Sequence, residues 1–171
     1  MDTIKTERLD LAPLNPTQLQ QYLEQPDLLE QELGIPISRG IVTEIVQRAI
    51  RMKLAKMANA DKTLFAWYTY WLLVIRSAPF GAGLVGFKGP PNQNGEVEIG
   101  YGIDQNYQGQ GYMTEAVRAM ISWAFKETSC CSVTAPNTKK WNLASQRVLL
   151  KAGMKVYEES EDAFSFKIER D

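Results

Sequence analysis

The order of apolar and polar positions predicts a chain that alternates between strands and helices. Alternation with a period of two predicts strands, and the aromatic and β-branched residues within Leu64–Arg76 indicate at least one more. The other expected strands are Ile4–Leu11, Gly83–Lys88, Glu96–Ile103, Ser132–Ala135, Lys155–Glu158 and Phe164–Ile168. Apolar positions three and four residues apart predict helices, which begin at Asn15-Pro16-Thr17 and then cover Ile41–Asn59, Met113–Thr128 and Asn142–Ala152. We therefore expect an α/β fold with a mixed sheet.

The composition adds a size and a class to this pattern. The chain has 171 residues, of which 44% are hydrophobic and 23% charged, as in one globular domain. We expect a single domain over residues 1–171, either a monomer or a homodimer. A net charge of −1 provides no basic field for nucleic acid, and no apolar run approaches the roughly 20 residues of a membrane span. The N-terminus resembles no signal peptide, so we expect a cytoplasmic protein that binds neither nucleic acid nor a membrane.

The chain has no histidine, which restricts its chemistry. Mechanisms that need a Ser-His or Cys-His pair, or a histidine metal ligand, are excluded. The two cysteines, Cys130 and Cys131, are adjacent and imply no disulfide framework. Burial as small apolar residues is the default for them, and no metal is expected. Any proton transfer must use a carboxylate, hydroxyl, thiol, amine or water.

A glycine-containing loop joins the strand Glu96–Ile103 to the next helix. Gln108–Met113 includes Gly109 and Gly111, which allow close approach of a ligand to the backbone. The helix start offers unpaired N–H groups and a partial positive charge, and together these favour an anion such as a pyrophosphate. The loop matches neither a P-loop nor the dinucleotide fingerprint. The alternative is a tight strand-to-helix turn with no ligand.

Three blocks of sequence resemble the GNAT N-acetyltransferase superfamily, and within it the RimJ/RimL-like group. The first block is Glu98–Asp104 followed by Tyr107–Ala116, which contains the family's Gln-x-x-Gly loop. The second is Asn142-x-x-Ser145 followed by Lys151–Met154. The third is the opening segment, from Thr6–Leu9 through Pro13 and Leu14, which resembles the group's first strand. Their order along the chain is that of the family.

The sequence departs from the family pattern at two positions in these blocks. Met113 stands where the family has glycine or alanine, and Met154 stands where phenylalanine is usual. Because the loop contacts are made by backbone N–H groups, the first departure leaves the loop's function possible. Residues 15–65 carry no resemblance, although the segment Pro16–Asp61 within them is expected to contribute to the acceptor side.

The resemblance implies an acetyl-CoA-dependent N-acetyltransferase with a GNAT fold. In that α/β (α+β) fold a central mixed, mostly antiparallel sheet has one splayed strand pair and is flanked by helices. Acetyl-CoA is the implied co-substrate, and the partner is an amine acceptor, either a protein N-terminus or a small molecule. The residues implied for the cofactor are Tyr101, Gly102, Ile103, Gln108, Gly109, Gln110, Gly111, Tyr112, Met113, Thr114 and Asn142. The first three bind the pantetheine amides through the backbone of the splayed strand, Gln108–Thr114 bind the pyrophosphate, and Asn142 contacts the pantetheine arm. A plain N-cap is the other interpretation of Asn142.

The resemblance also implies two catalytic candidates. Many family members place a tyrosine acid seven residues after the asparagine, but that position is Leu149 here. In the RimL-like group the serine three residues after the asparagine is the proposed acid, which implies Ser145; a helix-capping hydroxyl is its alternative. Glu98 is the candidate base, and its alternative is a structural carboxylate paired with the Gln108 loop or with Arg8. Glu158 and Glu159 are weaker candidates that fit solvated surface charge.

Several further features carry two interpretations each. The aromatic run Trp67–Trp71 fits either an acceptor groove or strand core, and Trp141 fits either helix packing or a flank of the acyl channel. Lys139 and Lys140 fit either the CoA 3′-phosphate or a solvated basic pair. For the protein as a whole, two alternatives to an active enzyme stay open: a catalytically weak or inactive acyl-CoA-binding module of the same fold, and a partner-binding domain without ligand.

Overall fold

The computed structural model describes residues 2–171, which form one eight-stranded sheet with helices on both faces. The strand order is β1-β2-β3-β4-β5-β6-β8-β7, and every neighbouring pair is antiparallel except β5 with β6. The strands are β1 (Ile4–Lys5), β2 (Leu9–Pro13), β3 (Trp71–Ile75), β4 (Phe80–Phe87), β5 (Glu96–Ile103), β6 (Ser132–Lys139), β7 (Lys155–Glu159) and β8 (Ala163–Glu169). The predicted mixed, mostly antiparallel sheet is confirmed.

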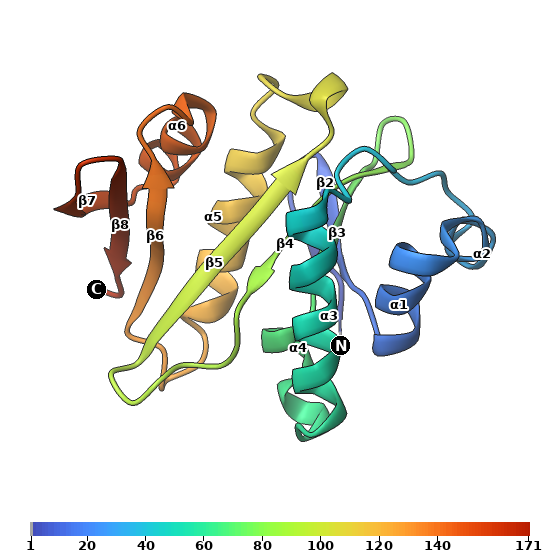
Figure 1. The fold of residues 1–171 in the computed structure, drawn as a ribbon, viewed down its shortest axis with the longest axis horizontal. Coiled ribbons are helices and arrows are strands. Elements are labelled where there is room, and N and C mark those ends of the chain that lie inside the picture. Colours follow the sequence, from blue (N-terminus) through green and yellow to red (C-terminus); the bar gives the residue numbers. More distant parts are fainter. Residues whose placement is uncertain (1) are drawn as a thin grey trace.

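The parallel pair β5–β6 opens into a fork part of the way along (Figure 1). The two strands pair only at Glu96–Ser132, Val97–Val133 and Glu98–Thr134. Beyond Glu98, β5 continues to pair with β4 on its other side as far as Ile103. The edge of β5 that faces β6 therefore has no strand partner over residues 99–103, and the predicted splayed pair is confirmed.

The helices divide between the two faces of the sheet. They are α1 (Pro16–Glu24), α2 (Pro26–Leu33), α3 (Glu44–Ala58), α4 (Phe65–Tyr68), α5 (Tyr112–Ala124) and α6 (Leu143–Lys151), with 3₁₀ turns η1 (Lys62–Leu64) and η2 (Gln105–Tyr107). In Figure 1 α5 lies behind the sheet and α3 in front of it. Alternate residues of β3 follow this division, since Leu73 packs in the cluster that contains α5 and Leu72 in the cluster that contains α1 and α3.

The first predicted strand, Ile4–Leu11, is wrong as a single element. The chain turns at residues 6–8, so that β1 and β2 form a hairpin in which Ile4 pairs with Leu11. The Thr6 amide donates to the Leu9 carbonyl at 2.9 Å, and the Thr6 hydroxyl accepts from the Leu9 amide at 3.1 Å. This hydrogen-bonded turn occupies the polar residues 6–8, which separate the apolar positions Ile4 and Leu9 in the sequence.

The aromatic segment Leu64–Arg76 contains one strand, but its first part is helical. Asp61 caps η1 by accepting from the Thr63 amide at 2.8 Å, and α4 follows before β3 begins at Trp71. Trp67 is buried against Trp123 of α5, with ring centroids 4.5 Å apart. Trp71 also packs on Trp123, so these two tryptophans belong to the core and not to a groove.

Two predicted helices are shorter than expected. The helix predicted over Ile41–Asn59 starts at Glu44, where Thr43 caps it. The helix predicted over Met113–Thr128 ends at Ala124 because the chain turns there, and the Arg170 guanidinium donates to the carbonyls of Glu127 and Thr128 beyond the end. Of the adjacent cysteines, Cys130 is buried as expected, whereas the expected burial of Cys131 is wrong, because Cys131 is exposed. No helix formed by residues 2–171 has the length and apolar character that crossing a membrane requires.

Candidate cofactor and acyl-transfer site

The loop between β5 and α5 adopts the backbone geometry that its glycines allow. Gly109 has φ 76° and Gly111 has φ 82°, both in the left-handed region, where a side chain costs about 1–2 kcal/mol. Gly111 then serves as the N-cap of α5. Within residues 2–171, the amides of Gly109–Thr114 make no hydrogen bond to the protein. The loop therefore presents a series of unpaired donors at a helix N-terminus, where the helix dipole favours an anion.

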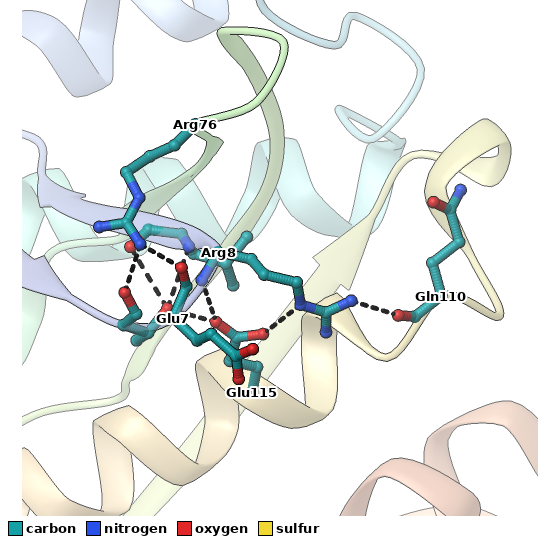
Figure 2. A network of polar contacts seen from close by, with 7 residues as sticks. Glu7, Arg8, Arg76, Gln110 and Glu115 are labelled. Atoms are coloured by element: carbon teal, nitrogen blue, oxygen red, sulfur yellow. Dashed lines mark hydrogen bonds and ion pairs between the residues drawn. The ribbon is translucent and has the colours of Figure 1, made fainter.

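Arg8 supports this loop from the distant N-terminal hairpin. Its guanidinium donates to Glu115 of α5 at 2.7 Å and to the carbonyl of Gln110 at 2.9 Å, as Figure 2 shows. The Arg8 guanidinium also lies 4.5 Å from the centre of the Tyr112 ring. The hairpin itself is held by Arg76, which donates to the carbonyls of Thr6 and Glu7. Arg8 thus fixes the Gln110 carbonyl away from the unpaired amides.

Glu115 carries a negative charge within the first turn of α5. Burial acts to raise its pKa, but hydrogen bonds from the Thr6 hydroxyl and from Arg8 outweigh that effect and leave the pKa below its usual range. Glu115 is therefore ionised at neutral pH, and its charge is balanced by Arg8. The alternative that paired Arg8 with Glu98 is wrong, because Arg8 is bound to Glu115.

A second support reaches the loop from the segment between α2 and α3. Asp104, directly after β5, accepts from the Ser38 hydroxyl at 2.5 Å and from the Asn106 amide at 2.8 Å. The Ser38 hydroxyl bond, followed by the Asn106 bond, lowers the pKa of Asp104. Ser38 is buried, and its carbonyl accepts from the Tyr22 hydroxyl at 2.7 Å. Ser38 lies among residues 15–65, where the sequence carried no signal of a role near this loop.

A cavity of about 360 Å³ lies between this loop, the open edge of β5 and the start of α6. The predicted cofactor residues that line it are Tyr101, Gly102, Ile103, Gln108, Gly109, Gly111, Tyr112, Met113, Thr114 and Asn142. Gln110 is the predicted residue that does not line it, because its carbonyl points to Arg8. Two segments that are separate in the sequence, residues 101–114 and 142–151, thus contribute to one cavity.

The cations of the cavity differ from those that the sequence suggested. Arg147 and Lys151, on successive turns of α6, line it. Lys139 and Lys140 do not line it and instead pair with Asp162 and Glu159. Trp141 is also outside it, with 79% of its surface exposed. The spacing of Arg147 and Lys151 on one helix face was the signal available in the sequence.

The start of α6 places two predicted side chains at the cavity. The Asn142 side chain accepts from the Ser145 amide at 3.1 Å, so the N-cap geometry is present, and Asn142 also lines the cavity. The Ser145 hydroxyl is 2.8 Å from the hydroxyl of Tyr101 on β5. Burial raises the pKa of Tyr101 to about 12, against a smaller lowering effect of the Ser145 bond. The sequence suggested a backbone role for Tyr101 but not this side-chain pair.

Glu98 lies apart from that cavity. It occupies the last paired position before the fork and forms an ion pair with Lys88. Together with Asn92 and Thr134 it borders a separate hollow of about 250 Å³. The structure therefore does not bring Glu98 together with Ser145, and its role as a base stays a prediction. Glu158 and Glu159 lie on β7, where every residue is exposed.

Comparison with known proteins gives an independent view of the chain. A model of the acetyltransferase (GNAT) domain matches residues 8–155. The chain is 28% identical over 127 residues to the uncharacterised N-acetyltransferase p20 of Bacillus licheniformis, covering 73% of this chain and 67% of that protein. It is 34% identical over 83 residues to the uncharacterised N-acetyltransferase YjdG of Bacillus subtilis (strain 168), covering 48% of this chain. That match spans 49%, or about half, of YjdG.

Solved structures with low sequence identity share the fold. The ribosomal-protein-S5-alanine acetyltransferase of Vibrio fischeri superposes with a TM-score of 0.64 at 18% identity, covering 100% of this chain and 98% of that one. The ribosomal L7/L12 alpha-N-protein acetyltransferase RimL, solved with coenzyme A, superposes with a TM-score of 0.62 at 17% identity, covering 98% of each chain. The fold predicted from the three sequence blocks is confirmed.

Proposed function

This chain belongs to the acetyltransferase (GNAT) family, and we propose that it transfers the acetyl group of acetyl-CoA to a primary amine by direct attack in a ternary complex. The observation that carries the proposal is the set of unpaired amides at Gly109–Thr114. All of these residues except Gln110 line the same cavity as the open edge of β5. Two kinds of unpaired backbone group at one cavity suit a ligand with a diphosphate at one end and amides at the other.

The residues present fit such a ligand in charge as well as in shape. The loop amides would hold the diphosphate, with Arg147 and Lys151 adding positive charge. The backbone of Tyr101–Ile103 would pair with the pantetheine amides as a further strand does, and Asn142 would contact the same arm. Bound acetyl-CoA supplies the thioester; every other task falls to groups of the chain.

Three chemical tasks follow for these groups. A backbone N–H on the open edge of β5 would stabilise the oxyanion, and Ser145 would give a proton to the departing thiolate. The acceptor amine must either bind in its neutral form or lose a proton after it binds. Glu98 is the proposed base from the sequence, although its ion pair with Lys88 favours water in its place.

The cost of deprotonation favours one class of acceptor. A lysine amine with a pKa of about 10.4 costs about 4.6 kcal/mol to deprotonate at pH 7, whereas an α-amino group with a pKa of about 8 costs about 1.4 kcal/mol. A site with no histidine suits the second. Two structural neighbours are named as acetyltransferases of ribosomal proteins, one of them an alpha-N-protein enzyme. We therefore propose a protein N-terminus as the acceptor ahead of a small-molecule amine, and the cytoplasm, in keeping with two free cysteines, as the compartment.

The test combines ligand binding with turnover. Acetyl-CoA at concentrations far above its dissociation constant should raise the melting temperature, because it binds only the folded chain. Thiol release should then be screened with peptides bearing free N-termini, with the same peptides N-terminally blocked as the matched control, and with polyamines, amino acids and aminoglycosides. No thermal shift and no thiol release would contradict the proposal. Binding without thiol release from any amine would favour the inactive acyl-CoA-binding module.

A further inference from the structure

The helix position that carries the acid in many relatives cannot supply one in this chain. Leu149 stands there, is fully buried and packs in the core cluster below α5. A hydroxyl reaches the start of α6 from a different element instead. Tyr101 extends from the open half of β5, and its oxygen lies 2.8 Å from the Ser145 hydroxyl and 3.2 Å from the Ser145 carbonyl. Both residues line the cavity.

The chemistry of the two groups determines which of them donates. A carbonyl oxygen only accepts, so the phenol donates in the 3.2 Å contact. Burial keeps the pKa of Tyr101 at about 12, so the phenol retains its proton at neutral pH. A small rotation of that single O–H switches its proton between the Ser145 carbonyl and the Ser145 hydroxyl oxygen. When the hydroxyl oxygen accepts, the serine proton is left for another partner in the cavity.

We propose that Tyr101 is a positioning residue that donates to the Ser145 hydroxyl oxygen and thereby directs the serine proton to the departing thiolate. The inference rests on the proposed function. It assigns the side chain of Tyr101 a task separate from that of its backbone. The rigid strand β5, paired with β4 up to Ile103, holds the phenol, so the serine proton is oriented before the reaction begins.

The proton transfers balance with this pair in place. As the carbon–sulfur bond breaks, the sulfur takes the Ser145 proton, so an S–H bond forms and the serine O–H bond breaks. The hydrogen bond from Tyr101 stabilises the negative charge that develops on the serine oxygen as the serine proton moves to sulfur. The amine nitrogen loses one proton to water and Ser145 regains one from water. For a neutral amine, the one proton lost by nitrogen equals the one gained by sulfur, so the reaction neither consumes nor releases a proton.

Tyr101→Phe removes the phenol oxygen and keeps the ring. With the acceptor found in the thiol-release screen, we expect kcat to fall about 10- to 100-fold, as for loss of a hydrogen bond to a charged group, with KM for acetyl-CoA changed less than about threefold. Ser145→Ala should lower kcat at least as far, and the double variant should be no slower than Ser145→Ala. Tyr157→Phe, the same change at an exposed tyrosine of β7, is the control and should match the wild type in kcat and in melting temperature.

A binding measurement tests the pair without turnover. If the serine proton is directed at sulfur, bound CoA is stabilised as its thiolate, and its thiol pKa, followed by ultraviolet absorbance, should be lower in the wild type than in Tyr101→Phe or Ser145→Ala. An unchanged thiol pKa in Tyr101→Phe, or full kcat in that variant, would overturn the inference. Failure of the wild type to bind CoA at all would instead remove the proposed function on which the inference rests.

Discussion

Backbone groups are hydrogen-bonded on one side of the sheet's centre and left unpaired on the other. On the β2–β3–β4 side, each strand is paired along both edges. Carbonyls near the ends of these strands also have a hydrogen-bond donor. There the Nζ atom of Lys53 on α3, which is buried, lies at donor distance from the carbonyls of Tyr68, Thr69 and Phe87, at 2.9, 3.3 and 2.5 Å. On the β5–β6 side, the strands part after Glu98 and the amides of Gly109–Thr114 have no partner within residues 2–171.

This contrast shows which part of the fold has backbone groups free to bind a ligand. Buried backbone groups are normally paired, because leaving one unpaired costs about 1–3 kcal/mol. Gly109, Gln110 and Gly111 are exposed, so water can pair with their amides at little cost until a ligand replaces it. Arg8 and Ser38 support this loop from outside the fork, through Glu115 and Asp104. The paired half thus provides stability, and the unpaired half provides the candidate site.

The largest expected effect concerns Lys53. Lys53→Met removes the side-chain donor that lies beside three carbonyls. It should lower the free energy of unfolding by about 3 kcal/mol at pH 9, where the neutral amine donates two hydrogen bonds. Desolvation lowers the pKa of Lys53 to about 7, so above that pH the unfolded chain binds a proton that the folded chain has released. Wild-type stability should therefore rise with pH, by about 2 kcal/mol relative to Lys53→Met between pH 7 and 9. Urea unfolding at the two pH values measures this, and a difference that does not vary with pH would refute it.

A smaller effect is expected from Gly111→Ala, which tests the open half. The substitution places a side chain at φ 82°, costing about 1–2 kcal/mol, and its Cβ would lie 3.3 Å from the Arg8 guanidinium. CoA affinity measured by calorimetry should fall about tenfold or more. Gly34→Ala is the matched control, since it has φ 68°, no atom within 4 Å of the added Cβ, and a place at the end of α2. It should lose similar stability and no affinity; equal affinities in both variants would mean that the loop does not bind CoA.

The smallest expected effects compare a cation that lines the cavity, Arg147, with one that lies outside it, Lys140. Arg147→Ala removes a charge that lines the cavity and should weaken CoA binding about three- to tenfold, less so at high salt. Lys140→Ala removes a surface ion pair with Glu159 and should change affinity less than about twofold and stability by less than about 1 kcal/mol. A larger loss in Lys140→Ala than in Arg147→Ala would reverse the assignment of these cations.

Features that depend on short stretches of chain were predictable from the sequence. The loop Gln108–Met113, its two glycines and the helix that follows lie within a few residues of one another, and β5 was predicted with the bounds it has. The aromatic and β-branched run Leu64–Arg76 favours a strand by composition, but strand propensity depends strongly on tertiary context. A cap at Asp61 and packing of Trp67 on Trp123 made its first part helical.

The sequence by itself determined the glycine loop Gln108–Met113 and the strand and helix on either side of it, because glycine φ angles and apolar periods act over a few residues. The open edge of β5 was expected only from the resemblance to a known family. Tertiary structure alone decided which side chains support and complete the site. Arg8 and Glu115 are 107 positions apart, Ser38 and Asp104 are 66 apart, and Tyr101 and Ser145 are 44 apart. Such pairs arise from the register and packing of distant elements, which no local preference encodes. For the same reason, Lys53 gave no sign along the chain that it would lie beneath three carbonyls.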